Sequence, residues 1–186
     1  RPFSPASVVR EIAALYGPTL RTGRVRLNCD TQGNDDLWVL GDLQKLTQII
    51  TNLVSNAVKF TDKGDIDIVL SCDAPGVPKP HYRLTVRDTG IGMTQVQLER
   101  LFDAFVQVDE SDRRKDLGSG LGLSISKQLA NLMDCELTVN SAPKRGSEFT
   151  LTLPLITATN PELDEASEYS RPEAGSSSRV LVVEDS

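Results

Sequence analysis

A row of polar side chains runs along one predicted helix face. Gln48, Asn52, Asn56 and Lys59 follow one another at spacings of four, four and three residues within the stretch 42–60, which places them on one side of a helix. Asparagine costs about half a kcal/mol relative to alanine inside a helix, so two in line require an explanation. A solvated helix face is one explanation. The other is a ligand that meets amide oxygens and one ammonium, since an asparagine oxygen suits Mg²⁺ held together with phosphates.

A carboxylate followed by glycines stands at the end of a predicted strand, in the segment RDTGIGM over 87–93. The residues D-T-G are common in turns, so a strand-to-helix turn explains them. A second explanation is that Asp88 accepts a hydrogen bond from an amino group, such as the one adenine carries where guanine carries an acceptor. Because a buried acceptor left unpaired costs about 1–3 kcal/mol, Asp88 would then select adenine. Gly90 and Gly92 would let the backbone lie beside a base or a sugar.

Alternating glycines precede another predicted helix, in Gly118–Ser119–Gly120–Leu121–Gly122. The dinucleotide-binding fingerprint is excluded by context, because a charged loop and not a strand comes before the glycines, and the sequence has no G-x-x-x-x-G-K-[ST] loop. What remains is a glycine-rich segment that leads into a helix N-terminus. Backbone N–H groups and the helix dipole favour a phosphate there, whereas a flexible hinge would need the same glycines.

These segments belong to a longer ordered series of motifs. Along the chain, N-L-x-x-N-A-x-K-F is followed by D-x-G-x-G, F-x-x-F, G-x-G-L-G-L and G-S-x-F. Residues from about 3 to 156 thereby resemble the ATP-binding catalytic domain of sensor histidine kinases, within the gyrase, Hsp90, kinase and MutL ATPase superfamily. NLVSNAVKF resembles the N box of that family, DTGIG the G1 box, LFDAF the F box, GSGLGLSI the G2 box and GSEFTLTLP the final glycine box.

The resemblance assigns roles at the phosphates of a bound nucleotide. Asn56 would coordinate a Mg²⁺ ion that bridges the phosphates, and Asn52 and Lys59 would assist there as supporting catalytic residues. Phe60 would pack beside the nucleotide. The phosphates would be cradled by the glycine-rich segment, whose residues are Gly118, Ser119, Gly120, Leu121 and Gly122.

The resemblance also assigns the adenine pocket and the ATP lid. Asp88 would bond the adenine amine with Gly90 and Gly92 beside it, and Ser147 is a further pocket candidate. Residues 107–117 would form the lid, which carries seven charges. The lid would be anchored by Phe102 and Phe105, and its candidates for contact with the γ-phosphate are Arg113, Arg114 and Lys115.

Asn52 also bears on the reaction. Members of the superfamily that hydrolyse ATP carry a glutamate base at this position, and an amide cannot take a proton from water at neutral pH. The resemblance therefore implies a protein histidine kinase, which transfers the γ-phosphate of Mg-ATP to a histidine on a dimerisation and phosphoacceptor hairpin. That hairpin is absent from the sequence, and the single histidine, His81, opens a predicted strand. We therefore expect no self-labelling.

Two other classes of function remain open at this stage. One is a degenerate nucleotide-binding module that only switches conformation or binds partners, and the intact motifs argue against it. The other is a hydrolytic ATPase of the same superfamily, against which Asn52 argues.

Charge and cysteine content fit an intracellular domain. Of the net charge of −6, most falls in residues 157–178, where five acids accompany one arginine. The remainder is nearly neutral and offers no basic surface for nucleic acid. Cys29, Cys72 and Cys135 form no C-x-x-C pair, which favours a reducing, cytoplasmic compartment. No apolar run reaches the roughly 20 residues of a membrane-spanning helix, and the sequence leaves open whether a longer parent protein is attached to a membrane.

Periodicity places the elements that would position these residues. Helices are predicted over 5–16, 42–60, 93–105 with Thr94 as N-cap, and 121–133. Strands are predicted over 24–29, 36–40, 65–72, 82–88, 135–141 and 147–154, of which the third and fourth form a hairpin and the last two a second pair. The resemblance implies an α/β fold of two layers, the Bergerat sandwich, with a mixed sheet and helices on one face.

The chain divides into three predicted parts. Residues 1–156 form the catalytic domain, and 157–178 form an acidic linker too polar to fold alone. Residues 179–186, RVLVVEDS, resemble the first strand of a receiver domain, with Glu184 and Asp185 matching its acidic Mg²⁺-binding pair. A hybrid histidine kinase has this arrangement, and we expect this chain to be a segment of one. Because dimerisation would come from the absent hairpin, we expect the segment to be a monomer.

Overall fold

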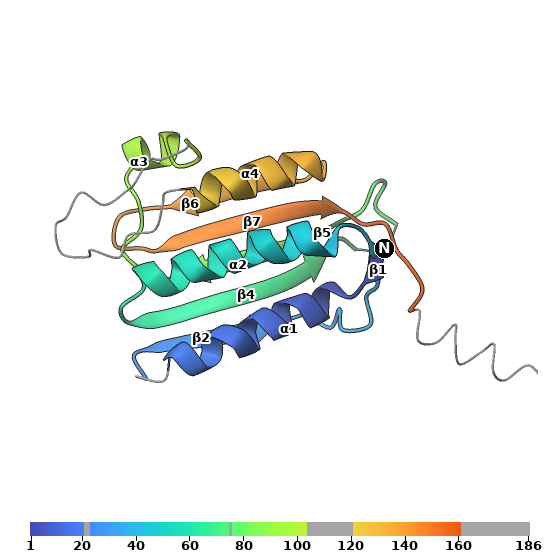
Figure 1. The fold of residues 1–186 in the computed structure, drawn as a ribbon, viewed down its shortest axis with the longest axis horizontal. Helices are drawn as coiled ribbons and strands as arrows, with labels where there is room; N and C mark the ends of the chain where they lie inside the picture. Colours follow the sequence, from blue (N-terminus) through green and yellow to red (C-terminus); the bar gives the residue numbers. More distant parts are fainter. Residues whose placement is uncertain (21–22, 75, 104–120, 161–186) are drawn as a thin grey trace, which may run out of the picture.

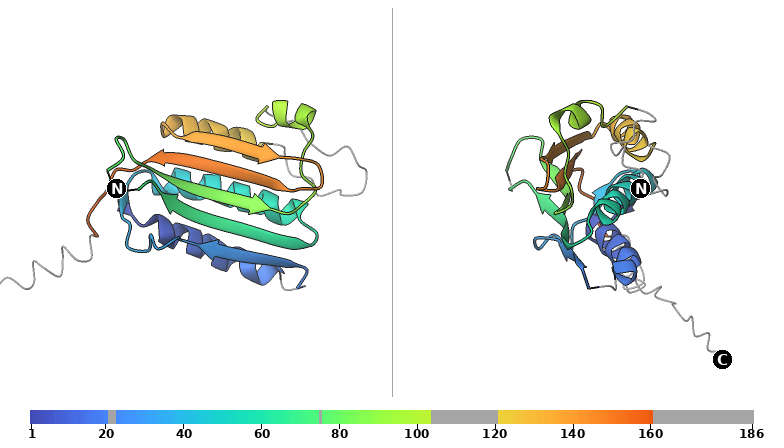
Figure 2. Two further views of the ribbon diagram at one scale, coloured as in Figure 1. Left: turned by 180° about the vertical axis from the view of Figure 1, so that it is seen from behind. Right: turned by 90° about the vertical axis from the view of Figure 1, so that its left-hand side faces the viewer.

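A sheet covered by helices on one face makes up the described part of the chain. The computed structural model describes residues 1–20, 23–74, 76–103 and 121–160. Within them, the long helices are α1 (Pro5–Tyr16), α2 (Leu43–Phe60) and α4 (Gly122–Leu132). All three lie on one face of a five-stranded sheet, here called the main sheet, and its other face is uncovered (Figures 1 and 2). The predicted two-layer α/β sandwich with helices on one face is confirmed.

The main sheet is mixed, as predicted. Its strands lie in the order β2-β4-β5-β7-β6, where only β2 and β4 pair in parallel. The predicted hairpin is β4 with β5, and the predicted second pair is β6 with β7, both antiparallel. The bounds of the strands are β2 Val25–Asp30, β4 Gly64–Cys72, β5 His81–Asp88, β6 Glu136–Ser141 and β7 Ser147–Pro154.

The hydrophobic core lies between the main sheet and the helices. Apolar and polar residues alternate along the strands, so Ile68 of β4 and Leu84 of β5 face the helices and are fully buried. Leu46, Ile49 and Leu53 of α2 meet them and are also 0% exposed. Each such side chain contributes about 1.5–3 kcal/mol when buried. The apolar side of α2 is thereby fixed against the sheet, and its polar side faces outward and toward α4.

The ends of α2 agree with the sequence. Asp42 is the N-cap, and its carboxylate accepts a hydrogen bond from the Lys45 N–H at 3.0 Å. The helix ends at Thr61, whose φ of −112° and ψ of 105° are extended. Gly64 then begins β4 with a φ of +124°, and a Cβ there would lie 2.1 Å from Thr89 Oγ1. Glycine is therefore required at this turn.

A small second sheet was not anticipated. The predicted strand over 36–40 is limited to β3 (Val39–Leu40), which pairs with β1 (Pro2–Phe3) rather than with the main sheet. On the other side of β3, the Leu40 N–H donates to the Ile156 carbonyl at 2.8 Å, and the Ala158 N–H donates to the Trp38 carbonyl at 2.9 Å. The predicted domain boundary at 156 falls inside this pairing.

The helical prediction over 93–105 differs from the structure. The helix over 93–105 is limited to α3 (Gln95–Glu99), because turns with i→i−3 bonds at Leu101 and Asp103 follow it. Its predicted N-cap is confirmed: Thr94 and Gln97 form a capping box. α1 has the predicted bounds, and Ala13 and Tyr16 near its end pack against the core, whereas Leu15 is 65% exposed. A short 3₁₀ helix, η1 (Gly17–Leu20), follows α1.

Candidate functional site

The three segments with candidate chemistry meet along α2. At its end, the Phe60 carbonyl accepts a hydrogen bond from the Ile91 N–H, in the turn that follows β5, at 3.3 Å. Earlier in α2, the Asn52 amide donates to the Gly122 carbonyl at the start of α4, at 3.2 Å. Figure 1 shows α2 lying between α1 and α4 across the main sheet. The fold therefore assembles residues that the sequence spreads over about 70 positions.

Asp88 is a buried carboxylate at the end of β5. It is 7% exposed, and its Oδ1 atom accepts a hydrogen bond from the Gly90 N–H at 2.8 Å. Burial raises the pKa of Asp88 above the usual aspartate value, and the backbone N–H groups of Gly90 and Ser147 oppose this rise. No cationic side chain in the described ranges pairs with it. The carboxylate is thus held in place by backbone alone.

Glycines beside Asp88 are required by close approach of backbone to backbone. A Cβ on Gly90 would lie 2.3 Å from the Phe60 carbonyl oxygen. Gly92 has a φ of +64°, and its Cβ would lie 1.9 Å from the Ala142 carbonyl oxygen. In the structure these two glycines approach other parts of the chain, whereas the sequence prediction placed a base or a sugar beside them. The prediction of a nucleotide there stays untested.

Gly146 opens the final glycine box, although the sequence analysis assigned it no role of its own. Its φ is +77°, and a Cβ there would lie 1.9 Å from the Asp88 carbonyl oxygen. Ser147 follows it, lies opposite Asp88 in the β5–β7 register, and is 9% exposed. The Ser141 hydroxyl donates to the Gly146 carbonyl at 2.7 Å and lies 3.0 Å from the Ser147 hydroxyl. The turn between β6 and β7 therefore holds Gly146 and Ser147, which lie next to Asp88, in place.

The polar row on α2 divides into two environments. Asn52 is hydrogen-bonded on both sides of its amide: Gln48 Nε2 donates to its Oδ1 atom at 3.2 Å, and its Nδ2 atom donates to α4. The Asn56 side chain is half-buried and makes no hydrogen bond with the described part of the chain. Lys59 places its Nζ atom 5.1 Å from the centroid of the Phe60 ring. Among the described residues, Asn52 thus has hydrogen-bond partners within the protein and Asn56 has none.

Several predicted site residues lie outside the described residues. They are the lid 107–117 with Arg113, Arg114 and Lys115, the anchor Phe105, and Gly118, Ser119 and Gly120 of the glycine segment. The described ends of this stretch are Phe102 and Leu121. The Phe102 ring lies 5.5 Å from Lys127 Nζ of α4, and Leu121 directly precedes α4, whose first residue is Gly122.

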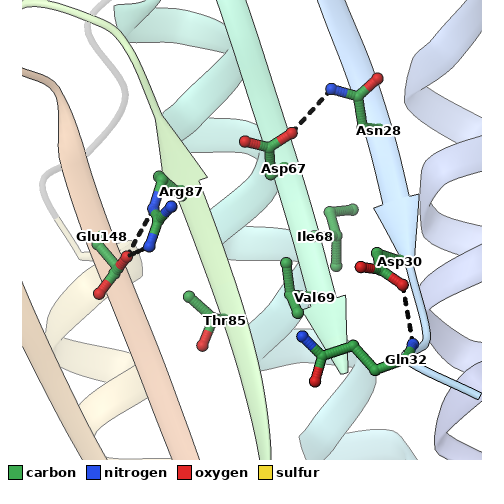
Figure 3. Close-up of a pocket in the computed structure, with 9 residues that line it drawn as sticks. All are labelled: Asn28, Asp30, Gln32, Asp67, Ile68, Val69, Thr85, Arg87 and Glu148. Atoms are coloured by element: carbon green, nitrogen blue, oxygen red, sulfur yellow. Dashed lines mark hydrogen bonds and ion pairs between the residues drawn. The ribbon is translucent and has the colours of Figure 1, made fainter. Parts of the chain in front are cut away.

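The surface has a hollow on the face of the main sheet opposite to the helices. Figure 3 shows its floor on β2, β4, β5 and β7, and its volume is about 340 Å³. Asn28 donates to Asp67 at 2.8 Å, and Arg87 forms an ion pair with Glu148. Asp30 accepts from the Gln32 backbone N–H at 2.9 Å, so each charged group drawn there has a polar partner. The hollow is therefore separate from the residues along α2.

The donor set along α2 fits a nucleotide better than a metal held by protein alone. Within the described ranges, no three His, Cys, Asp or Glu side chains gather as a metal site. Mg²⁺ bound mainly by phosphates and waters needs only one or two protein oxygens, and the Asn56 amide is available for that. Asp88 offers a buried acceptor at the other end. None of the helices in the described ranges has the length and apolar character needed to cross a membrane.

Residues 41–157 match the family of histidine kinase-, DNA gyrase B- and HSP90-like ATPases, and the chain belongs to this family. It is 40% identical to the sensor histidine kinase RcsC of Salmonella typhimurium over 161 residues, which are 87% of this chain and 16% of that protein. It is 39% identical to the signal transduction histidine-protein kinase BarA of Escherichia coli K12, over 80% of this chain and 16% of BarA. The chain thus spans about a sixth of these relatives' length.

Solved structures agree with the fold. Full-length ShkA, crystallised in complex with AMPPNP, superposes with a TM-score of 0.73 at 30% identity, over 87% of this chain and 32% of ShkA. The nucleotide-free catalytic domain of the histidine kinase ThkA gives a TM-score of 0.69 at 23% identity, over 84% of this chain and 95% of that domain. The prediction of an ATP-binding catalytic domain of the histidine kinase type is confirmed.

Proposed function

We propose that this chain binds Mg-ATP beside α2 and transfers the γ-phosphate to a histidine on a hairpin of a longer parent protein. The observation that carries the proposal is Asp88. It is a carboxylate buried at the end of a strand, held by backbone N–H groups, and without a cationic partner among the described residues. Such a group is costly to bury unless a further donor completes it.

An adenine amine is the donor that suits Asp88. The carboxylate only accepts hydrogen bonds when ionised, so it attracts an N–H and repels the carbonyl oxygen that guanine presents in its place. Ser147 lies opposite Asp88 and adds a hydroxyl that can accept or donate. Gly90 and the Phe60 carbonyl lie next to Asp88 on the side of α2. We infer that the pocket selects adenine over guanine.

Asn56 and Lys59 are the α2 residues that support a Mg-phosphate site. The Asn56 amide oxygen would be a ligand of Mg²⁺, and the remaining ligands would be phosphate oxygens and waters. The ion, when bound, neutralises charge on the phosphates. Lys59 lies one turn further along the same face and would bring an ammonium to them. The glycine segment before α4 would offer its backbone N–H groups from the other side.

The reaction would be an in-line phosphoryl transfer. A nitrogen of the acceptor histidine forms a bond to the γ-phosphorus while the bond from that phosphorus to the bridging oxygen breaks, and ADP leaves. The chain's own residues hold the nucleotide and shape the site. Asn52 stands where a hydrolytic base would be needed and cannot take a proton from water. Transfer should therefore be favoured over hydrolysis.

The parent protein would be a hybrid histidine kinase. RcsC, BarA and the sensor histidine kinase GacS of Pseudomonas protegens, which is 36% identical over 83% of this chain, support this. Its hairpin would carry the acceptor histidine. Residues 107–117 would act as the lid, and 179–186 would begin a receiver domain after the acidic linker. We expect the γ-phosphate contact to come from one of the basic lid residues.

Titration calorimetry with ADP and with GDP, each with and without Mg²⁺, tests the binding proposal. We expect Mg²⁺-sensitive binding of ADP and at least tenfold weaker binding of GDP. A second assay mixes the chain with labelled ATP and a separately produced histidine-bearing hairpin, and we expect label on the hairpin and none on this chain.

The outcomes separate the three classes of function. Absence of ADP binding by the folded chain would contradict the proposal and favour a degenerate module. ADP binding with no label on the hairpin but with steady release of phosphate would instead favour a hydrolytic ATPase. Equal affinity for ADP and GDP would overturn the role of Asp88 while leaving phosphate binding intact.

A further inference from the structure

A partly buried hydrogen-bonded cluster joins α2 to the first turns of α4. The Asn52 Nδ2 atom lies 3.2 Å from the Gly122 carbonyl oxygen and 3.2 Å from Ser126 Oγ. The Ser126 hydroxyl lies 2.9 Å from the same Gly122 oxygen. Ser126 is 0% exposed. The three groups thus form a closed triangle, here called the Asn52 clamp, next to the last glycine of the glycine segment.

Proton counting fixes the direction of each bond in the Asn52 clamp. A carbonyl oxygen can only accept, so the single hydroxyl proton of Ser126 goes to Gly122. Ser126 Oγ must then accept from Asn52. The Asn52 Nδ2 atom therefore donates toward both partners, which lie on the same side of it. The amide is oriented with its nitrogen toward α4 and its oxygen toward Gln48 Nε2, which donates to it at 3.2 Å.

This arrangement directs the amide nitrogen of Asn52 toward α4. We propose that Ser126 is a positioning residue of the nucleotide site, and that Asn52 acts through the first turn of α4 rather than by contact with the phosphates. The proposal rests on the function proposed above. Phosphates at the start of α4 would meet the N–H groups of its first turn. The Asn52 clamp sets where that turn lies relative to Asn56, so loss of Ser126 should weaken phosphate binding and leave adenine binding unchanged.

Ser124 provides a matched control on the same helix. It is also buried, 6% exposed, and its hydroxyl donates to the Leu121 carbonyl at 2.9 Å, a bond within its own chain segment. Its hydroxyl has no bond to α2 in the described structure. Ser126→Ala and Ser124→Ala therefore remove the same atoms from the same helix, and only the first breaks a bond to Asn52.

The experiment measures the affinity of the chain for Mg-ADP and for adenosine, which lacks phosphates. We expect Ser126→Ala to weaken Mg-ADP binding roughly fivefold, the effect of one net hydrogen bond, with adenosine affinity within twofold of the wild type. Ser124→Ala should leave both within twofold. A general loss of folding would instead weaken adenosine and Mg-ADP alike, and that result would contradict a positioning role. If Ser126→Ala does not fold, Ser126→Cys, which keeps the size but not the strong acceptor, replaces it.

A double-mutant cycle tests the route through α4. If Asn52 acts through the Asn52 clamp, Ser126→Ala costs less than twofold in Mg-ADP affinity once Asn52 is alanine. If the fold-losses in Mg-ADP affinity of Asn52→Ala and Ser126→Ala instead multiply in the double variant, Asn52 contacts the phosphates independently. That result would overturn the inference. Failure of the wild type to bind either ligand would contradict the proposed function itself. Wild-type binding with an unchanged Ser126→Ala would contradict this inference alone.

Discussion

The two faces of the main sheet use their carboxylates differently. On the uncovered face, Asp65 accepts from Arg26 Nε at 2.7 Å, and this bond lowers the pKa of Asp65. On the face that packs against the helices, Asp88 has no such partner among the described residues, and burial raises its pKa. Arg87 and Asp88 are neighbours in β5 and point to opposite faces. A paired charge on the uncovered face costs little free energy. A buried carboxylate without a cationic partner among the described residues costs more, which favours a ligand at Asp88.

The contrast also separates two kinds of surface. The hollow on the uncovered face is built from ion pairs and hydrogen bonds that satisfy each other (Figure 3). The site along α2 keeps an acceptor at Asp88 and an amide at Asn56 for something outside the described residues. The shape of the surface is therefore a poorer guide to function here than whether the polar groups of a site already have hydrogen-bond partners.

The largest effect should come from the glycine that supports Asp88. Gly146→Ala forces a side chain into a φ of +77° and brings a Cβ within 1.9 Å of the Asp88 carbonyl oxygen. We expect a loss of about 2 kcal/mol or more in the free energy of unfolding, measured by urea denaturation. Gly23→Ala is the control, because its φ of +69° is similar but no atom lies within 4 Å of the new Cβ. Equal losses of unfolding free energy in the two variants would show that the chain around Asp88 moves to admit the new Cβ without cost.

Asp88→Asn should cost about tenfold or more in ADP affinity, which corresponds to roughly 1.4 kcal/mol. The amide can present its N–H to the adenine amine, and two donors do not pair. Calorimetry measures the change, and thermal unfolding confirms that the variant is folded. An unchanged affinity in the folded variant would mean that adenine does not bind at Asp88.

The pH dependence should distinguish the wild type from Asp88→Asn. Because the folded-state pKa of Asp88 is raised above its unfolded value, the folded state binds the proton more tightly. The stability that this proton contributes is present at low pH and is lost as pH rises from the unfolded pKa to the folded one. Urea denaturation at a series of pH values should show this loss only in the wild type. The same slope in both proteins would assign it to another group.

The smallest effect should come from the uncovered face. Glu148→Gln removes the charge that pairs with Arg87 at a partly exposed site, so the free energy of unfolding should fall by about 0.5 kcal/mol or less. ADP affinity should stay within twofold, as measured by calorimetry. A larger change in ADP affinity would show that the two faces are coupled and that the contrast between them is too simple.

Strong periodicity explains why much of the fold could be predicted. The apolar positions of α2 and the alternation in β4 and β5 leave few alternatives, and the cap at Asp42 marks the start of α2. The pairing of β1 with β3 could not be predicted, because strands of two residues carry no pattern. α3 is shorter than its apolar spacing suggested, since Leu101 reaches the core through a turn.

The site was predictable in its residue types but not in its contacts. Asp88, Asn56 and the glycines followed from motifs. Gly146 opens the G-S-x-F motif, but its close approach to Asp88 became visible only from the register of β7 with β5. Ser126 lies just outside the quoted motifs, and its bond to Asn52 depends on how α4 packs. The direction of the Asn52 amide nitrogen toward α4 likewise depends on how α4 packs.

The central claim, that Asp88 recognises the adenine amine, is tested most directly by removing either partner. Affinities of the wild type and Asp88→Asn are measured for ADP and for purine riboside diphosphate, which lacks only the amine. We predict that loss of the amine costs at least tenfold in the wild type and less than twofold in Asp88→Asn. An equal cost in both proteins would show that the amine is recognised elsewhere and would contradict the claim.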